Sequence, residues 1–234
     1  LPDHCLLITS EETDTAQKTY ESYVRSPACR PGDKALYNAL TEKASAAMGE
    51  AIYGAGKHHE DFLCLTYGTG VGGAIVRDRE VYHGCGFSAA EFGAIVTHAE
   101  ERLSGSSYFD GCYERYASTT GLVRMAMAYD PQLDNGRKIF ARLEDPRVLE
   151  ILDRWVDEIM LGLSTLTHIF NPACIVLGGG IMVQPLILEL IRKKRSRFIM
   201  PSFANVDIRP AELGNSAGLL GACHLAARYA KSRQ

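Results

Sequence analysis

A glycine turn in the first third of the chain has the composition of an anion-binding loop. Gly68-Thr69-Gly70 separates two apolar runs, residues 63–67 and 74–76, and this pattern predicts a β-hairpin with the glycines at its tip. Glycine amides can approach an anion closely because no Cβ intervenes, and Thr69 adds a hydroxyl donor. The turn therefore has two interpretations, a phosphate cradle or a hairpin tip that needs positive φ. It is not a P-loop, because no Gly-Lys-Ser/Thr follows.

The elements around this turn alternate between strands and helices. The strongest helix is predicted over residues 145–170, where apolar residues recur close to every 3.6 positions until Asn171-Pro172 ends the pattern. A buried strand is predicted at residues 174–177, directly before Gly178-Gly179-Gly180. Further strands are expected at residues 5–9 and 206–208, and further helices at residues 35–52, 121–129, 135–143, 184–192 and 216–231. This alternation indicates an α/β protein.

Composition narrows the classes of protein that remain. The 234 residues are 46% hydrophobic and 23% charged, with a net charge of −3, so a large core is possible and a nucleic-acid partner is not expected. The seven cysteines are scattered and form no Cys-x-x-Cys pair, which favours reduced thiols and a cytoplasmic location. Neither a signal peptide nor an apolar run of transmembrane length is visible, so no membrane partner is expected.

Several motifs follow one another in a fixed order between residues 44 and 226. They are Gly68-Thr69-Gly70-Val71-Gly72-Gly73, Ala89-Ala90-Glu91-Phe92-Gly93, Gly111-Cys112-Tyr113-Glu114, Asn171-Pro172 with Gly178-Gly179-Gly180, and Ala217-Gly218-Leu219-Leu220-Gly221-Ala222. Their order and spacing resemble the ROK family, which contains sugar kinases and sugar-responsive transcriptional repressors. The resemblance implies an α/β fold of the actin-like ATPase (ribonuclease H-like) type, in which two lobes hold nucleotide and sugar in the cleft between them.

The resemblance also implies roles for individual residues. It makes Gly68, Thr69 and Gly70 the second phosphate loop and places Gly178, Gly179 and Gly180 beside the adenosine. Glu91 and Glu114 match carboxylates that bind sugar hydroxyls, a role for which carboxylates are suited because they accept paired hydrogen bonds. For Glu114 the alternative is a carboxylate in the first turn of a helix, stabilised by the helix dipole. The implied ligands are ATP with Mg²⁺ and a hexose or N-acetylhexosamine, and the implied assembly is a homodimer.

The N-terminal part of the chain departs from the family pattern. Kinases of the family begin with Asp-x-Gly-Gly-Thr, the first phosphate loop, and the sequence does not contain this motif. About fifty residues precede the matching part, fewer than a full first lobe needs. We therefore expect residues 1–50 to be a reduced N-terminal lobe and residues 51–234 to be the C-terminal lobe, with residues 216–234 as a closing helix.

The catalytic base and the zinc cluster of the family are also altered. The position of the family's catalytic aspartate falls within Thr41-Glu42-Lys43, so Glu42 is the candidate base, and its alternative is a solvated helix glutamate. The histidine that binds sugar and zinc in the family is replaced by Ala94. Of the family's zinc cysteines, Cys112 remains, while Gly105 and Ser107 occupy two other positions. One thiolate cannot hold a tetrahedral zinc ion, so a structural zinc at these positions is not expected.

Two functional hypotheses follow. The first is an ATP-dependent, glucokinase-like sugar kinase, which needs phosphate positioning, charge neutralisation and a base on the acceptor. The second is a non-catalytic sugar-sensing or regulatory protein, as in the repressor members of the family. No helix-turn-helix is visible in the sequence, so direct DNA binding is not expected. A third possibility is a degenerate relative whose role is association.

Overall fold

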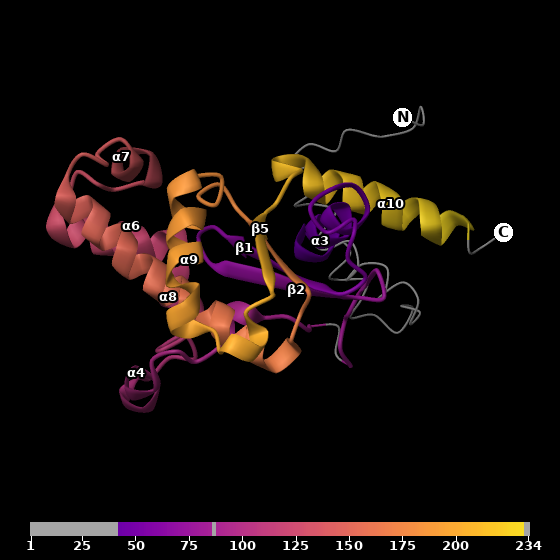
Figure 1. Ribbon diagram of the computed structural model, residues 1–234, viewed down its shortest axis with the longest axis horizontal. Coiled ribbons are helices and arrows are strands. Elements are labelled where there is room, and N and C mark those ends of the chain that lie inside the picture. The colour runs from indigo at the N-terminus through magenta and orange to yellow at the C-terminus, as the bar shows by residue number, and fades with distance from the viewer. Residues whose placement is uncertain (1–41, 86–87, 232–234) are drawn as a thin grey trace.

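The computed structural model describes residues 42–85 and 88–231 (Figure 1). The strand predicted at residues 5–9 and the first part of the helix predicted at residues 35–52 lie outside these ranges. The rest of that helix is α3 (Glu42–Tyr53). The boundary expected at residue 50 falls inside this helix, and the division of the chain into two lobes stays a prediction.

A five-stranded mixed sheet forms the centre of the described structure. Its strands are β1 (Phe62–Tyr67), β2 (Val71–Arg77), β3 (Glu80–Val81), β4 (Cys174–Gly178) and β5 (Asp207–Pro210), in the order β3-β2-β1-β4-β5. β2 runs antiparallel to both β1 and β3, whereas β4 is parallel to β1 and to β5. The predicted glycine hairpin is confirmed as β1 and β2. Asp78 and Arg79 both have positive φ, as a two-residue hairpin turn between β2 and β3 requires.

Helices cover both faces of the sheet, which explains why its central strands are apolar on both sides. Alternate residues of β1 and β4 divide between the two faces: Leu63, Leu65 and Ile175 belong to one core, and Phe62, Cys64 and Cys174 to the other. The first core contains α8 (Pro146–Phe170) and α9 (Pro185–Phe198), and the second contains α3. Figure 1 shows α8 and α9 on one side of the sheet and α3 with α10 (Ala217–Lys231) on the other.

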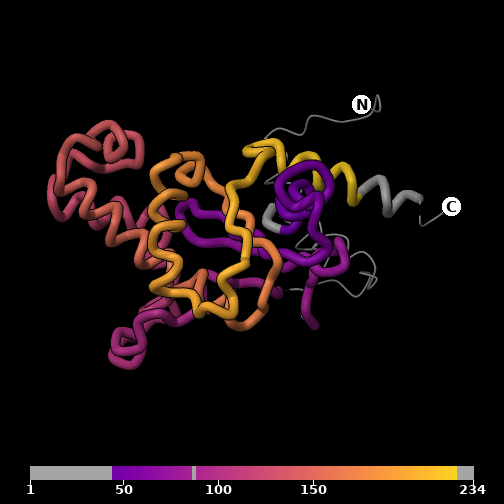
Figure 2. The backbone as a smooth tube through the Cα atoms, in the orientation of Figure 1, coloured from indigo at the N-terminus to yellow at the C-terminus, as the bar shows by residue number. Residues whose placement is uncertain are grey.

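The contact between α3 and α10 depends on glycine. A Cβ on Gly221 would lie 1.7 Å from the Ser45 carbonyl oxygen, and one on Gly49 would lie 2.2 Å from the Ala217 carbonyl oxygen. The two helix backbones therefore approach more closely than any side chain allows, and they lie side by side in Figures 1 and 2. The helix predicted at residues 216–231 is confirmed as α10.

The ends of α8 and α9 are set by specific contacts. Asp145 caps α8 by accepting a hydrogen bond from the Arg147 amide, and Asn171 ends the helix in the left-handed conformation. α9 continues to Phe198 instead of ending at residue 192. The basic run at its end is not simply solvated, because Lys194 is 11% exposed and forms ion pairs with Asp153 and Asp157 of α8.

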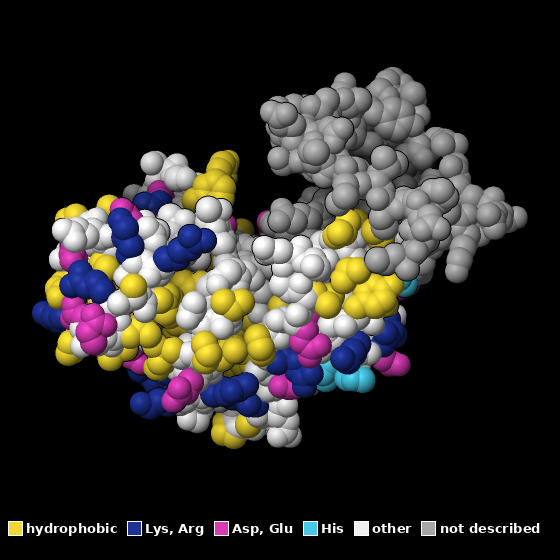
Figure 3. All heavy atoms as spheres, turned by 90° about the horizontal axis from the view of Figure 1, so that it is seen from above, with side chains coloured by type: hydrophobic (Ala, Val, Ile, Leu, Met, Phe, Trp, Pro, Cys, Tyr) yellow, Lys and Arg dark blue, Asp and Glu magenta, His cyan; other side chains and the backbone are white. Residues whose placement is uncertain are grey.

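Shorter elements complete the described structure. They are α4 (Ala99–Ser104), α5 (Tyr113–Ala117), α6 (Thr119–Tyr129), α7 (Gly136–Phe140) and three 3₁₀ turns, η1 (Phe92–Ala94), η2 (Pro201–Phe203) and η3 (Gly214–Ser216). On the face seen in Figure 3, basic and acidic side chains are interspersed around apolar ones. Within the described ranges, every helix is too short or too polar to cross a bilayer.

Candidate functional site

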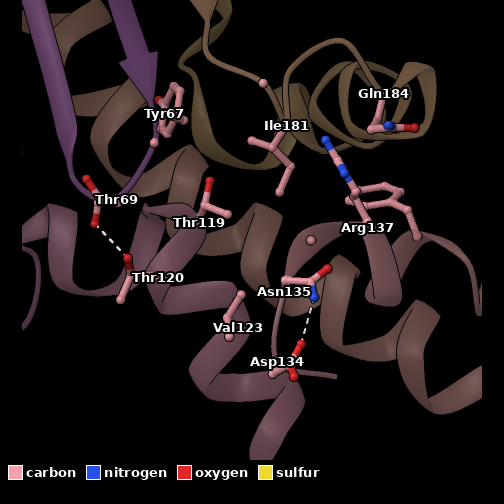
Figure 4. Close-up of a pocket in the computed structure, with 14 residues that line it drawn as sticks. Tyr67, Thr69, Thr119, Thr120, Val123, Asp134, Asn135, Arg137, Ile181 and Gln184 are labelled. Atoms are coloured by element: carbon pink, nitrogen blue, oxygen red, sulfur yellow. Dashed lines mark hydrogen bonds between the residues drawn. The ribbon is translucent and has the colours of Figure 1, made fainter. Parts of the chain in front are cut away.

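The tip of the β1–β2 hairpin is fixed to the first turn of α6. Gly68 donates its amide to the Gly70 carbonyl at 3.0 Å, and its own carbonyl accepts the Thr119 amide at 2.9 Å. The Thr120 hydroxyl donates to the Thr69 carbonyl at 2.8 Å, the contact marked in Figure 4. The glycine turn is therefore held beside a helix N-terminus, whose partial positive charge favours anions.

The second glycine turn follows β4 and lies against the end of β1. Gly179 has φ of +102°, and a Cβ there would lie 2.1 Å from the Tyr67 carbonyl oxygen. Gly178 is buried in the strand, whereas a Cβ on Gly180 would have no neighbour within 4 Å. The turn therefore combines one position that only glycine can occupy with one that faces open space. Both glycine turns lie at the carboxyl ends of parallel strands, where ligands bind in open α/β sheets.

Two cavities meet at the hairpin tip. The first, of about 850 Å³, extends towards α6 and α7, and the second, of about 640 Å³, extends towards α5 and the start of α10. Tyr67, Gly68, Thr69 and Gly180 line both. Each volume lies within the range of small-molecule sites. A ligand in one cavity and a ligand in the other would thus share the glycine wall between them.

The first cavity combines apolar walls with a few polar groups. Figure 4 shows Thr69, Thr119 and Thr120 on one side and Arg137 with Gln184 on the other. Thr119, Thr120, Arg137 and Gln184 were not predicted as site residues from the sequence. The available signals were helix starts: Ser118 and Asn135 were expected at such positions, and both cap helices by accepting amide hydrogen bonds. Capping signals do not indicate that α6 and α7 face the same glycine turn.

Glu114 lies between the hairpin tip and the loop that carries Glu91. Its Oε2 accepts the Val71 amide at 3.4 Å. A Cβ on Gly70 would lie 2.6 Å from this oxygen, and a Cβ on Gly93 would lie 2.9 Å from it. Glycine at both positions therefore leaves space for the carboxylate, which lines the second cavity. Glu114 also stands in the first turn of α5, so its position satisfies the helix-dipole interpretation as well.

Glu91 is exposed and directly precedes η1. The next two residues anchor its loop, because Phe92 is buried against Gly73 of β2 and Gly93 packs against the Val71 carbonyl and Glu114. The structure therefore brings the loop that carries Glu91 into contact with Glu114 in the first turn of α5. Only Phe92 separates Glu91 from Gly93, the glycine that contacts Glu114.

Glu42 is the first residue of α3. Ala46 follows it by one helical turn and lines the second cavity, and residues four apart share a helix face. The backbone of α3 thus places Glu42 at the end of the helix face that borders this cavity.

Two buried contacts support the walls of the cavities. Tyr67 donates its hydroxyl to the Tyr113 hydroxyl at 2.8 Å, and Tyr113 donates to the Ile159 carbonyl of α8 at 2.8 Å. Burial raises the pKa of both phenols, so both stay protonated and can donate. Trp155 donates its indole N–H to the Ser118 carbonyl at 3.1 Å, directly before Thr119. These contacts connect the end of β1 and the start of α6 to the long helix.

The loop that carries the family's zinc cysteines is held here by other contacts. Asp110 accepts the Ser106 and Ser107 amides at 3.0 Å each and forms an ion pair with Arg115 at 2.6 Å. The hydrogen bond from Ser107 is the main reason why the pKa of Asp110 is lowered. The Cys112 thiol faces the Tyr108 and Ala94 carbonyls. One thiol among backbone carbonyls does not fit a tetrahedral thiolate zinc site.

Fold and site together define a class of protein. A sheet of order β3-β2-β1-β4-β5, covered by helices on both faces, with two glycine turns at the carboxyl ends of its central strands, is an α/β fold of the actin-like ATPase type.

Comparison with known proteins identifies the family. The ROK family profile matches residues 37–229. The chain is 33% identical over 207 residues to a glucokinase from Streptomyces coelicolor, which covers 78% of this chain and 64% of the glucokinase. It is 28% identical over 185 residues to a xylose repressor from Bacillus spizizenii, covering 77% of this chain and 47% of the repressor. The chain belongs to the ROK family.

A solved structure gives the same result in three dimensions. The ROK family glucokinase from Streptomyces griseus, in complex with glucose and AMPPNP, superposes with a TM-score of 0.70 at 33% identity, over 80% of this chain and 67% of the glucokinase. The expected actin-like fold is therefore confirmed. The chain spans about six tenths of the length of the curated kinase relatives that it matches.

Proposed function

We propose that the chain takes part in ATP-dependent phosphorylation of a hexose or N-acetylhexosamine hydroxyl, as the C-terminal lobe of a ROK-type sugar kinase. In this proposal Gly68, Thr69 and Gly70 hold the terminal phosphates. Gly178, Gly179 and Gly180 border the adenosine, and Gly180 is the one that lines the first cavity. Glu91 and Glu114 accept hydrogen bonds from sugar hydroxyls on the side of the second cavity.

The observation that supports this proposal most strongly is the meeting of the two cavities at Gly68 and Thr69. Phosphoryl transfer requires a nucleotide and an acceptor that approach the same phosphate from opposite sides. The hairpin tip borders both cavities, and Glu114 lies next to Gly70. A nucleoside in the larger cavity and a sugar beside Glu114 would therefore place the transferred phosphate at the glycine turn.

The remaining chemistry needs a cation and a base. Mg²⁺ bound to ATP neutralises the charge that develops on the phosphates. The candidate base is Glu42, at the start of α3. Its side chain is one methylene longer than the aspartate of the family, and a displacement of about 1 Å can reduce turnover a hundredfold. The proposed turnover is therefore more sensitive to the position of the Glu42 carboxylate than to the glycine turns.

The test is a coupled ATP-to-ADP assay across hexoses and N-acetylhexosamines, with sugar binding measured by calorimetry. Glu114→Gln should weaken sugar binding by about tenfold or more, because a charge-assisted hydrogen bond contributes roughly 1.5–3 kcal/mol. Glu42→Gln should abolish turnover without weakening sugar binding to the same extent. Glu189→Gln, on the exposed face of α9, is the matched control and should leave both quantities unchanged.

A second candidate is a sugar sensor without turnover. The relationship to a xylose repressor favours it. Saturable sugar binding with no ADP production for any sugar would support the sensor over the kinase. If neither sugar nor nucleotide binds, both proposals are wrong.

A further inference from the structure

We propose that His59, Cys174 and Asp207 form a binding site for a transition-metal ion of the Zn²⁺ type, at the end of the sheet opposite the glycine turns. Each residue offers one ligand atom, and the imidazole nitrogen, the thiol sulfur and the carboxylate oxygen all lie within 4.8 Å of one another. Zinc ligands at bond lengths of about 2.0–2.3 Å are separated by roughly 3.3–3.8 Å. Closing this set around an ion therefore needs side-chain movements of about 1 Å.

The topology of the sheet produces this set. Cys174 begins β4, Asp207 begins β5, and the two residues are partners in the parallel register. Neighbouring partners in parallel strands point to the same face of the sheet, and Cys174 belongs to the core beneath α3. His59 lies in the connection between α3 and β1, three residues before the start of β1, which is the other neighbour of β4. Three segments that are distant in sequence thus deliver one ligand each.

The contacts around the ligands fit a metal site. Arg209, two residues after Asp207 on β5, donates to Oδ2 of this carboxylate and to the Ala55 carbonyl. This fixes the carboxylate and leaves Oδ1 for an ion, as in metal sites where ligating carboxylates are held by a second group. The positive charge of Arg209 is thereby paired and does not stand alone beside the site. Cys174 is fully buried, so a bound cation would be shielded from water on that side.

The nature of the ligands selects the class of ion. Imidazole and thiolate ligands favour Zn²⁺ and similar transition metals over Mg²⁺ and Ca²⁺, which prefer oxygen. Three protein ligands leave a fourth tetrahedral position for water. Burial raises the pKa of the Cys174 thiol to about 12, so an ion that binds there has to displace its proton.

The proposed site is separate from the cavities and from the zinc loop of the family. Cys174 begins β4 and Gly178 ends it, so the site lies about 13 Å along the strand from the second glycine turn, at roughly 3.3 Å per residue. None of the three ligands lines either cavity. The expected effect is therefore on stability: an ion would tie the connection carrying His59 to the starts of β4 and β5. This inference does not depend on the proposed kinase activity.

The test is a titration of the purified full chain with Co²⁺, followed by competition with Zn²⁺ against a chromophoric chelator. We expect one equivalent of Co²⁺ to produce a thiolate-to-metal absorption band, and Zn²⁺ to abolish it. His59→Gln should weaken binding at least about tenfold, and Cys174→Ser should remove the thiolate band. Zn²⁺ should also raise the melting temperature of the wild-type protein.

The matched control is His58→Gln. His58 is exposed and adjacent to His59 in sequence, so its loss should leave the band, the affinity and the Zn²⁺-dependent melting temperature unchanged. His59 is part of a partly exposed connection, and its variant remains informative if Cys174→Ser fails to fold. The proposal is overturned if the wild-type protein gives no stoichiometric band, or if His59→Gln binds as tightly as the wild type.

Discussion

The carboxyl ends and the amino ends of β1 and β4 are surrounded by different chemical groups. At the carboxyl ends, both strands lead into glycine turns, and a Cβ on Gly68 or Gly180 would have no neighbour within 4 Å. At the amino ends, His59, Cys174 and Asp207 converge within a few ångströms. One end is lined by backbone and is open, and the other is lined by side chains and is partly buried.

This difference explains which ligands each end can hold. Backbone amides and a helix N-terminus attract a large anion and need glycine so that it can come close. Side chains with nitrogen, sulfur and oxygen atoms surround a small cation. The same sheet can therefore support two sites of opposite charge preference, because one site uses the carboxyl ends of β1 and β4 and the other uses the amino ends of β4 and β5 with the connection before β1.

The largest effect is expected at Gly179. Gly179→Ala forces a residue with a Cβ into φ of +102° and places that atom 2.1 Å from the Tyr67 carbonyl. We expect the free energy of unfolding to fall by about 3 kcal/mol, measured by urea denaturation. Gly180→Ala is the control, since nothing lies within 4 Å of its Cβ, and it should change stability by less than about 0.5 kcal/mol. Equal effects at the two positions would contradict the described turn.

The next largest effect is expected at Glu50, whose carboxylate links the segment that leads to His59 with the segment that leads to the second cavity. This buried carboxylate accepts the amides of Ala55, at the start of the connection to His59, and of Glu212 and Leu213, which lead to the second cavity. Glu50→Gln replaces one acceptor oxygen by a donor that faces backbone N–H groups. The free energy of unfolding should fall by about 2 kcal/mol.

Glu60→Gln is the control for Glu50→Gln, because Glu60 is exposed in the same connection. Its stability should match that of the wild type in the same denaturation experiment. A Glu50→Gln protein as stable as Glu60→Gln would show that the carboxylate does not hold the two segments together.

A smaller effect is expected from the two tyrosines behind the cavity wall. Tyr113→Phe removes both hydrogen bonds of the chain that runs from Tyr67 to Ile159, whereas Tyr67→Phe removes one and leaves Tyr113 bonded to Ile159. We expect losses of about 1.5 kcal/mol for Tyr113→Phe and about 0.7 kcal/mol for Tyr67→Phe, measured by thermal denaturation. The reverse order would mean that Tyr67, and not Tyr113, carries the connection.

The smallest effect is a pH dependence at Asp110. Its pKa in the folded protein is lowered below the ordinary 3.8, mainly by the hydrogen bond from the Ser107 amide and further by the Ser106 amide and Arg115. A lowered folded pKa contributes stability that is present above the unfolded value and is lost as the pH falls through the folded value. An NMR titration should find the Asp110 carboxyl pKa below 3.8. A value at or above 3.8 would show that Asp110 does not hold the 105–110 loop.

The sequence was most informative where local rules and the fold agree. The glycine hairpin, the long helix ended by Asn171 and the small-residue helix against α3 are all confirmed, because each follows from periodicity, capping or the absence of Cβ. The length of α9 was not predictable in this way. The helix was expected to end at residue 192, and the sequence alone does not indicate that Lys194 pairs with Asp153 and Asp157 of another helix.

The residues of the candidate site also differ in whether the sequence alone could predict them. Motif order led to the prediction that the glycine turns, Glu91 and Glu114 are site residues, and these roles stay predictions. Arg137 and Gln184 could not be selected, because their relevance arises from the way α7 and α9 approach the hairpin. The site of His59, Cys174 and Asp207 was missed for the same reason: no spacing in the sequence marks residues that meet through strand register.

The most direct test of the account is a calorimetric titration of the full chain with ATP and Mg²⁺, with the wild type compared with Gly180→Val. Gly180 lines both cavities, and a Cβ at this position would have no neighbour within 4 Å, so a valine side chain would enter the space that the cavities share. The account predicts saturable binding of one nucleotide to the wild type and at least about tenfold weaker binding to Gly180→Val. No saturable binding to the wild type, or equal affinity in the folded variant, would contradict it.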